Sequence, residues 1–177
     1  MAIDNGGGNQ DHRNLHDRIF NLIRPKNFLE FGLGIGTLYF LDKCDRVISF
    51  EVIVNPTQEG WTEEVLKLVG DNPNYKAIDF PHEDKFTEEL KMKIEFLLKN
   101  IKPDFVFVDS GCHCRADIIN LCLNHGVPSV TAHDTNHGFE AYGWDNIVVP
   151  NGYIVKKDTN GEGTTLFTKE EVLINNL

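Results

Sequence analysis

Three glycines at alternate positions directly follow a short apolar run, and this arrangement constrains the fold more than any other feature of the sequence. The run Phe28-Leu29-Glu30-Phe31 leads into Gly32-Leu33-Gly34-Ile35-Gly36. A strand that enters a glycine-rich turn and continues into a helix brings free backbone N–H groups to the carboxyl end of a sheet, where nucleotides bind. The pattern therefore predicts a nucleotide-binding α/β sheet.

Apolar runs typical of strands alternate with helical patterns along most of the chain. This alternation predicts a doubly wound α/β fold, in which a mostly parallel sheet is covered by helices on both faces. Near the C-terminus, runs at 152–156 and 164–167 flank the turn 160–163, which predicts an antiparallel hairpin at the sheet edge. The expected strands of the parallel part cover 28–31, 46–51, 75–80, 104–109 and 128–132, and the expected helices cover 15–24, 37–44, 61–69, 86–101 and 115–124.

The length of 177 residues fits one domain with one compact core. Residues 1–11 are rich in glycine, asparagine and aspartate. We expect them to form a flexible segment, followed by a single domain over 12–177.

The charge of the chain disfavours nucleic acid as a partner. Its 27 acidic residues outnumber 17 basic ones, which gives a formal net charge of −10, and Lys and Arg form no run that could neutralise phosphates. The sequence also has no N-terminal signal pattern and no apolar run near the roughly 18 residues of a membrane span. Its four cysteines are too few and too clustered for a disulfide framework. We therefore expect a cytoplasmic chain with reduced thiols and no membrane partner.

The spacing of the glycines distinguishes between two classes of nucleotide cofactor. In the dinucleotide-binding pattern G-x-G-x-x-G the third glycine would fall on Thr37, which argues against a nicotinamide cofactor. Gly36 instead completes a G-x-G-x-G spacing. Glu51 lies at the expected end of the next strand, where a carboxylate can accept both hydroxyl protons of an adenosine ribose.

At this point the sequence resembles class I S-adenosylmethionine-dependent methyltransferases. Leu29–Gly36 is similar to their first motif, and Glu51 is similar to their ribose-binding acid. The resemblance implies a Rossmann-like methyltransferase fold with S-adenosyl-L-methionine as the cofactor, in which Glu30 orders the loop or contacts the ammonium group. The cofactor-binding residues that it implies are Glu30, Gly32, Gly34, Gly36, Glu51 and Asp109.

Asp79 closes the third expected strand and has two interpretations. It is either a contact at the adenine edge of the cofactor or an ordinary acid at a turn.

A second constellation resembles a subgroup of these methyltransferases that acts on sugars and small hydroxylated molecules. Asp104–His113 is similar to the subgroup's V-D-G-x-H-like motif, and Ala132–Thr135 is similar to its H-D turn after the fifth strand. The resemblance implies methyl transfer to a hydroxyl of a small molecule or glycan. The sequence departs from the pattern at Ser110, where glycine is usual, and at 124–128, where a P-G-G turn is usual.

Removal of the hydroxyl proton has two candidate mechanisms. In the first, His113 is the base beside Asp109, because histidine titrates near neutral pH, at about 6.5. In the second, which the resemblance to metal-dependent O-methyltransferases implies, Asp109 and Asp134 hold a divalent cation such as Mg²⁺ that acidifies the hydroxyl. Asn136 could join that metal site.

Two other functions remain open. Ser110 and the missing P-G-G turn favour a non-catalytic module that binds S-adenosylmethionine or a partner, whereas Thr37 argues against an NAD-dependent oxidoreductase. The sequence leaves little room for a separate substrate domain, so acceptor specificity must come from the N-terminal segment, from the loop at about 135–144, or from a partner subunit. A homo-oligomer therefore also remains open.

Overall fold

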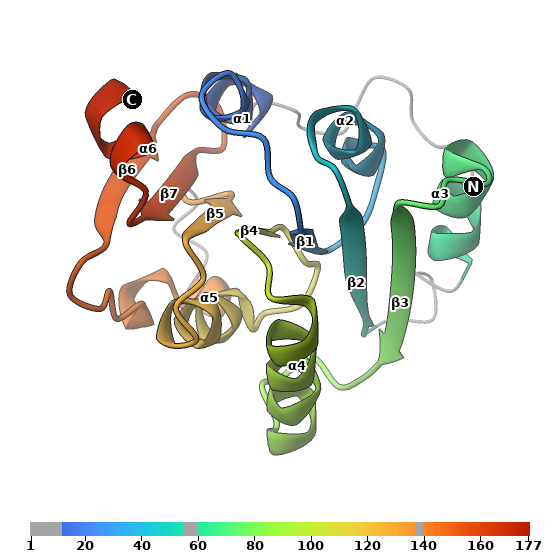
Figure 1. Cartoon of the computed structure of the whole chain (residues 1–177). Coiled ribbons are helices and arrows are strands. Elements are labelled where there is room, and N and C mark those ends of the chain that lie inside the picture. The colour runs from blue at the N-terminus through green and yellow to red at the C-terminus, as the bar shows by residue number, and fades with distance from the viewer. Residues whose placement is uncertain (1–11, 55–59, 137–139) are drawn as a thin grey trace.

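The computed structural model describes residues 12–54, 60–136 and 140–177, so the expected flexible segment 1–11 lies outside the described residues. The described strands form one sheet and are β1 (Phe28–Phe31), β2 (Val47–Ile53), β3 (Tyr75–Pro81), β4 (Phe105–Val108), β5 (Ser129–His133), β6 (Ile154–Asp158) and β7 (Thr164–Thr168). Their order is β3-β2-β1-β4-β5-β7-β6 (Figure 1). The first five strands pair in parallel, and β7 pairs antiparallel with β5 and β6. The predicted doubly wound fold with an antiparallel C-terminal hairpin is confirmed.

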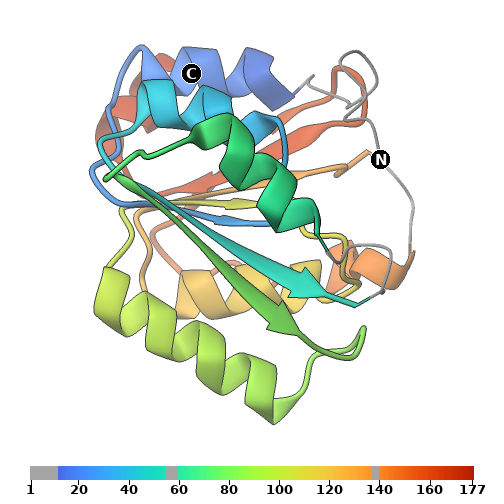
Figure 2. The same cartoon turned by 90° about the vertical axis from the view of Figure 1, so that its right-hand side faces the viewer.

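Helices cover both faces of this sheet. The helical elements are α1 (His12–Phe20), α2 (Gly36–Lys43), α3 (Trp61–Val69), α4 (Glu88–Ile101), α5 (Arg115–Asn124), the 3-10 turns η2 (Glu140–Tyr142) and η3 (Trp144–Asn146), and α6 (Glu171–Asn176). Figure 2 shows α1, α2 and α3 on one face and α4 and α5 on the other. Among the described residues, no helix is both long and apolar enough to cross a membrane.

The boundaries differ from the expected ones in one place that matters for the site. β2 continues beyond Glu51 to Ile53, because β3 pairs with it residue by residue as far as Pro81. Glu51 therefore lies within the strand, directly beside Asp79 of β3. The C-terminal helix α6 and the two 3-10 turns were not expected from the sequence pattern.

The sheet separates two apolar clusters, because alternate residues of each strand point to opposite faces. In β1, Leu29 and Phe31 pack with α4 and α5, whereas Phe28 packs with α1, α2 and α6. Glu30 follows Phe28 on the second of these faces. A carboxyl therefore occupies a buried position between β1 and α2.

Glu30 is held there by hydroxyl groups. Its side chain is 2% exposed, and it accepts hydrogen bonds from Thr37 Oγ1 at 2.6 Å and from Ser49 Oγ. Burial raises the pKa of Glu30 to about 8, although the two hydroxyl hydrogen bonds act in the opposite direction. Near neutral pH the carboxyl is therefore mostly uncharged, and it links the start of α2 to β2.

Gly32 allows the loop after β1 to touch the loop after β4. Its φ is +91°, and a Cβ at this position would lie 2.5 Å from the carbonyl oxygen of Asp109 and 2.9 Å from Cα of Ser110. These are backbone atoms, so no rotamer change could make room. Glycine at this position is thus required by the packing of the protein itself.

We expect Gly32→Ala to lower the free energy of unfolding by about 2–4 kcal/mol, because it adds left-handed strain and a backbone clash. Gly60→Ala is the matched control, since Gly60 is left-handed with a φ of +84° but its Cβ would meet nothing within 4 Å. The control should lose only about 1 kcal/mol of strain. Urea denaturation of both variants measures the difference, and equal losses would contradict the close contact.

The pKa of Glu30 predicts a pH dependence of stability. Because the folded-state pKa of about 8 lies above the unfolded value, Glu30 stabilises the fold fully below about pH 4 and loses this contribution as the pH rises to about 8. Glu30→Gln cannot ionise, so its stability relative to wild type should increase from pH 5 to 8 by up to about 1.4 kcal/mol per pH unit and then level off. Chemical denaturation across this range tests the prediction, and a constant difference would refute it.

Candidate cofactor and active site

The glycine loop between β1 and α2 is held in place by side chains from three other elements. The N–H of Leu33 donates to Glu51 Oε2 at 2.8 Å, and the carbonyl of Leu33 accepts from the indole N–H of Trp61 at 2.6 Å. The N–H of Gly34 donates to Thr37 Oγ1 at 3.2 Å, and this hydroxyl in turn donates to Glu30. The loop is therefore held by hydrogen bonds from the protein itself, with Glu30 acting through Thr37.

The other two glycines of the loop differ from Gly32, because the protein leaves room beside them. The nearest atom to a Cβ at Gly34 would be Cζ2 of Trp61 at 3.7 Å, and at Gly36 it would be Nε2 of His12 at 3.8 Å. These are ordinary contact distances, so packing within the described chain does not demand glycine at either position. Glycines that leave such space suit a ligand lying close to the backbone.

The start of α2 lies directly after the loop, at Gly36, and among the described residues no side chain caps its first turn. The N–H groups of Thr37 and Leu38 donate to the carbonyls of Gly34 and Ile35 at 3.1 and 3.2 Å, so these two donors are already used. What the helix start adds to the loop is the positive end of its dipole, which favours an anionic group.

Glu51 and Asp79 are neighbours on β2 and β3. Glu51 is 4% exposed, and burial raises its pKa to about 7, although the N–H of Leu33 stabilises the charged form. Asp79 Oδ1 accepts from the hydroxyl of Thr62 in α3 at 2.5 Å. Glu51 is thus attached to the glycine loop, whereas Asp79 is attached to α3, and the ribose contact of Glu51 stays a prediction. The adenine contact of Asp79 stays a prediction.

A buried arginine joins the carboxylates that follow β4 and β5. Nη1 of Arg115 lies 3.2 Å from Asp109 Oδ1 and 2.9 Å from Asp134 Oδ2, and Nε of Arg115 donates to the Ser110 carbonyl at 2.7 Å. The arginine side chain is only 4% exposed, and the ring of Tyr142 lies over its guanidinium at 4.0 Å. Asp109 and Asp134 therefore meet at one edge of the sheet, as the sequence predicted, but a cation of the protein lies between them.

His133 lies beside the same two carboxylates. Its Nδ1 is 3.4 Å from Asp109 Oδ1 and 3.3 Å from Asp134 Oδ1. Burial opposes ionisation of Asp109, but the hydrogen bond with His133 and the charge of Arg115 outweigh it and lower the pKa of this carboxyl. Asp109 is consequently ionised and remains 30% exposed, so it can face a ligand.

Two histidines of α1 extend this group into the interior. The ring centroid of His12 lies 5.0 Å from that of His133 and 5.4 Å from that of His16. His16 Nε2 is 2.9 Å from Thr131 Oγ1, and burial lowers the pKa of His16 well below its usual value. Helix α1 thus reaches the candidate site through two imidazoles, of which that of His16 is uncharged near neutral pH.

His113 lies on the outer rim instead. Its Nδ1 is 2.7 Å from Asp84 Oδ2, and its backbone N–H donates to Asp84 Oδ1 at 2.7 Å. The side chain is 46% exposed, and its ring centroid is 6.3 Å from that of Tyr142. The structure thus pairs His113 with Asp84 from the loop after β3, while the imidazole bonded to Asp109 is that of His133.

One group of side chains in the described chain has the spacing of a metal site. It consists of Asp109, His133 and Asp134, whose possible ligand atoms lie within 4.8 Å of one another. Arg115 already supplies the positive charge between the two carboxylates, so these residues do not fit a divalent cation as they stand. Asn136 lies apart from the cluster, because its amide donates to the carbonyls of Thr159 and Gly161 in the hairpin turn at 2.8 and 3.1 Å.

The residues that sequence reasoning missed act by supporting others. Arg115, Asp84 and Thr37 each hold a predicted site residue through a hydrogen bond or ion pair, and Trp61 holds Leu33 of the glycine loop. The contact of Thr37 with Gly34 is local, and Arg115 also had a usable signal, since a lone arginine in the first turn after an acid-ended strand can fold back onto that acid. The partners of Asp84 and Trp61 depend on how distant segments meet.

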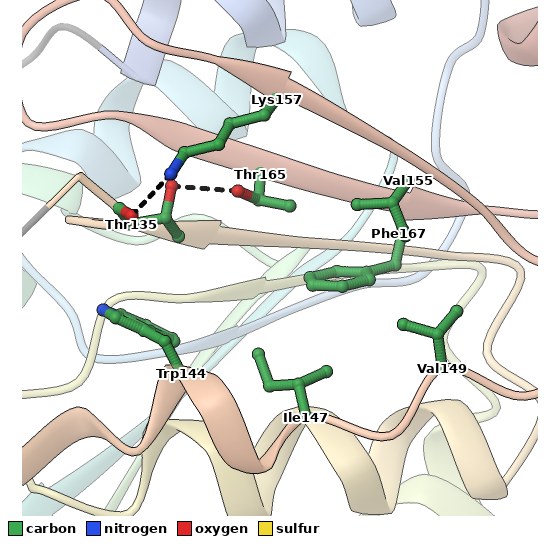
Figure 3. A pocket seen from close by; sticks show the side chains of 8 residues that line it. All are labelled: Thr135, Trp144, Ile147, Val149, Val155, Lys157, Thr165 and Phe167. Carbon is green, nitrogen blue, oxygen red and sulfur yellow. Dashed lines mark hydrogen bonds between the residues drawn. The ribbon is translucent and has the colours of Figure 1, made fainter. Parts of the chain in front are cut away.

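A cavity of about 200 Å³ lies between the hairpin and η3 (Figure 3). Trp144 and Ile147 face Phe167 and Val155 across its apolar part, and Thr135 with Lys157 lies at its polar end (Figure 3). Lys157 Nζ donates to the carbonyl of Thr135 at 2.9 Å. Because Thr135 directly follows Asp134, the cavity begins next to the carboxylate cluster. Residues 137–139 of the expected specificity loop lie outside the described residues.

Comparison with known proteins identifies the fold through structure and not through sequence. No family model matches the chain, and no curated protein matches it by sequence. An O-methyltransferase from Bacillus cereus in complex with SAH is similar with a TM-score of 0.65 and 13% identity, covering 96% of this chain and 84% of that one.

Other solved structures give the same result. A SAH-bound methyltransferase from Podospora anserina has a TM-score of 0.60 and 15% identity, over 89% of this chain and 76% of that one. An N-methyltransferase from Bradyrhizobium japonicum in complex with S-adenosyl-L-homocysteine has a TM-score of 0.54 and 12% identity, over 88% and 83%. The chain therefore has the Rossmann-like α/β fold of S-adenosylmethionine-dependent methyltransferases.

Proposed function

We propose that the chain is an S-adenosylmethionine-dependent methyltransferase that methylates a hydroxyl group of a small molecule or glycan. The observation that carries this proposal is the Glu51 carboxylate of β2, which accepts a hydrogen bond from the glycine loop after β1, beside two glycines where a Cβ would meet the protein only at ordinary contact distances. Solved methyltransferases that hold SAH on the same fold support the choice of cofactor.

In this proposal the chain binds the cofactor along the carboxyl ends of β1, β2 and β4. Gly34, Gly36 and the first turn of α2 would receive the methionine part, with the positive end of the helix dipole toward its carboxylate. Glu51 would accept the ribose hydroxyl protons, and Asp79 would lie toward the adenine. Bound there, the cofactor would supply an electrophilic methyl group on its sulfonium.

The acceptor hydroxyl must then lose a proton to a side chain. Asp109 is ionised, partly exposed and bonded to His133, so its oxygen can accept a hydrogen bond from the hydroxyl and orient it, although its lowered pKa makes it a weak base. His113 remains the other proposed base, since Asp84 holds its Nδ1 and thereby fixes the orientation of its ring. No step is assigned to a divalent cation, because Arg115 already lies between the two carboxylates that would hold one.

The acceptor is proposed to be small. The cavity beside Thr135 is mostly apolar with a polar end, which suits a compact molecule that carries a hydroxyl group. The acidic charge of the chain argues against a nucleic acid acceptor. The cytoplasmic location and the homo-oligomer stay predictions from the sequence.

A second candidate function is a module that binds the cofactor without turnover. It is favoured by the ion pairs of Asp109 and Asp134 with Arg115, which occupy both carboxylates. Incubation with labelled S-adenosylmethionine and a panel of hydroxylated acceptors separates the two functions. Label transfer that is lost in Asp109→Asn supports the enzyme, whereas cofactor binding without transfer to any acceptor supports the module.

Titration calorimetry with S-adenosylmethionine, S-adenosylhomocysteine and NAD tests the cofactor. Glu51→Gln keeps an oxygen for the N–H of Leu33 but removes the charge, so it should weaken binding of the first two ligands by about 1–3 kcal/mol. Glu88→Gln on exposed α4 is the matched control and should bind like wild type. Binding of NAD alone, or unchanged affinity in Glu51→Gln, would overturn the proposal.

The same carboxyl predicts a pH dependence of cofactor binding. The pKa of Glu51 is about 7, and ribose hydroxyl donors favour its charged form, so affinity should rise from pH 6 to 8. The increase can be at most about tenfold per pH unit for one proton. Glu51→Gln should lack this component when both proteins are titrated across the range. Parallel profiles for the two proteins would assign the dependence to another group.

A further inference from the structure

We infer that Arg115 takes the place of a divalent cation in this site, so that the chain joins its β4 and β5 carboxylates with its own guanidinium. In this inference Arg115 is a positioning residue, and the ion that it excludes is a divalent cation. It does not depend on the proposed methyl transfer, because ion binding can be measured without cofactor or acceptor.

Nη1 of Arg115 lies where a divalent cation would have to bind. A divalent cation bound by Asp109 and Asp134 would have to lie about 2.0–2.6 Å from an oxygen of each. Nη1 of Arg115 lies 3.2 Å from one of these carboxylates and 2.9 Å from the other. These are hydrogen-bond distances from the same two groups, so the guanidinium and the ion would compete for one position.

The charge of Arg115 also opposes binding of a divalent cation. Asp109 and Asp134 carry two negative charges, and Arg115 supplies one positive charge in a place where its side chain is 4% exposed. Arginine stays protonated in proteins. Adding a divalent ion beside it would place like charges next to each other with little water to screen them, which is strongly unfavourable.

The surrounding contacts hold Arg115 in this position. Its Nε donates to the carbonyl of Ser110 at 2.7 Å, and its Nη1 lies 3.3 Å from the carbonyl of His133. The ring of Tyr142 covers the guanidinium at 4.0 Å. One side chain therefore links the loop after β4 to the loop after β5, which is the structural contribution that a shared metal ion would make.

Removal of the guanidinium should change the chemistry of this cluster. Without Arg115, Asp109 and Asp134 would face each other as uncompensated carboxylates, with His133 Nδ1 beside both. Two carboxylates and an imidazole are an ordinary ligand set for Mn²⁺ and related ions. Removing the cation of the protein should therefore create a metal site.

The test is a Mn²⁺ titration followed by the electron paramagnetic resonance signal of the free ion. Wild type should show no saturable binding up to millimolar Mn²⁺. Arg115→Ala should bind one Mn²⁺ per chain with an affinity at least about tenfold above any binding by wild type, which corresponds to about 1.4 kcal/mol. Arg115→Lys keeps a positive charge and should behave like wild type. Adding Asp134→Asn to Arg115→Ala should abolish the gained binding.

Controls separate this result from nonspecific binding to an acidic protein. Arg24→Ala removes an exposed arginine paired with Asp45 at 2.6 Å, and it should leave Mn²⁺ binding unchanged. A rise in melting temperature with Mn²⁺ in Arg115→Ala, absent in Arg24→Ala and wild type, gives a second readout in favour of the inference.

Two results would overturn the inference. One is stoichiometric Mn²⁺ binding by wild type that Asp134→Asn abolishes, because Arg115 would then yield its place to the ion. The other is a folded Arg115→Ala that binds no more Mn²⁺ than wild type. If Arg115→Ala does not fold, the wild-type and Asp134→Asn titrations decide, since wild-type binding at this site refutes the inference and its absence supports it.

Discussion

The contact between Gly32 and the backbone at Asp109 is the constraint on which the rest of the candidate site depends. A side chain at Gly32 would meet the Asp109 carbonyl at 2.5 Å, so the loops after β1 and β4 can touch only because residue 32 has no Cβ. This contact brings the glycine loop, Glu51 and Asp109 to one edge of the sheet. Every role proposed for these residues requires that closeness.

The carboxyl groups at the two ends of this edge differ in how readily they ionise. Below the glycine loop, burial raises the pKa of both Glu30 and Glu51, so these carboxyls are protonated more readily than usual. At β4 and β5, Arg115 and His133 keep Asp109 ionised despite its burial. The two ends therefore differ in charge near neutral pH, because the first holds carboxyls that are readily protonated and the second holds a carboxylate that stays ionised.

Much of the fold and part of the site could be predicted from the sequence, because the signals involved are local. The apolar stripe of α4, capped by Thr87, and the glycine closing α3 each fix an element within a few residues. The hydrogen bond between Glu51 and the N–H of Leu33 was not predicted, because it depends on how the loop turns toward β2. The partner of His113 was not predicted either, since Asp84 reaches it from a loop whose path depends on the packing of α4.

The sequence by itself determined the order of strands and helices, the glycine loop and the acids at the strand ends, since periodicity and turn chemistry act over short distances. Only the tertiary structure decided that Gly32 is required by packing whereas Gly34 and Gly36 leave space, and that the imidazole beside Asp109 is His133. It also decided that Arg115 lies between Asp109 and Asp134. The physical reason is that β4 and β5 are brought together by the sheet, so the charge balance between their ends is a property of the folded chain.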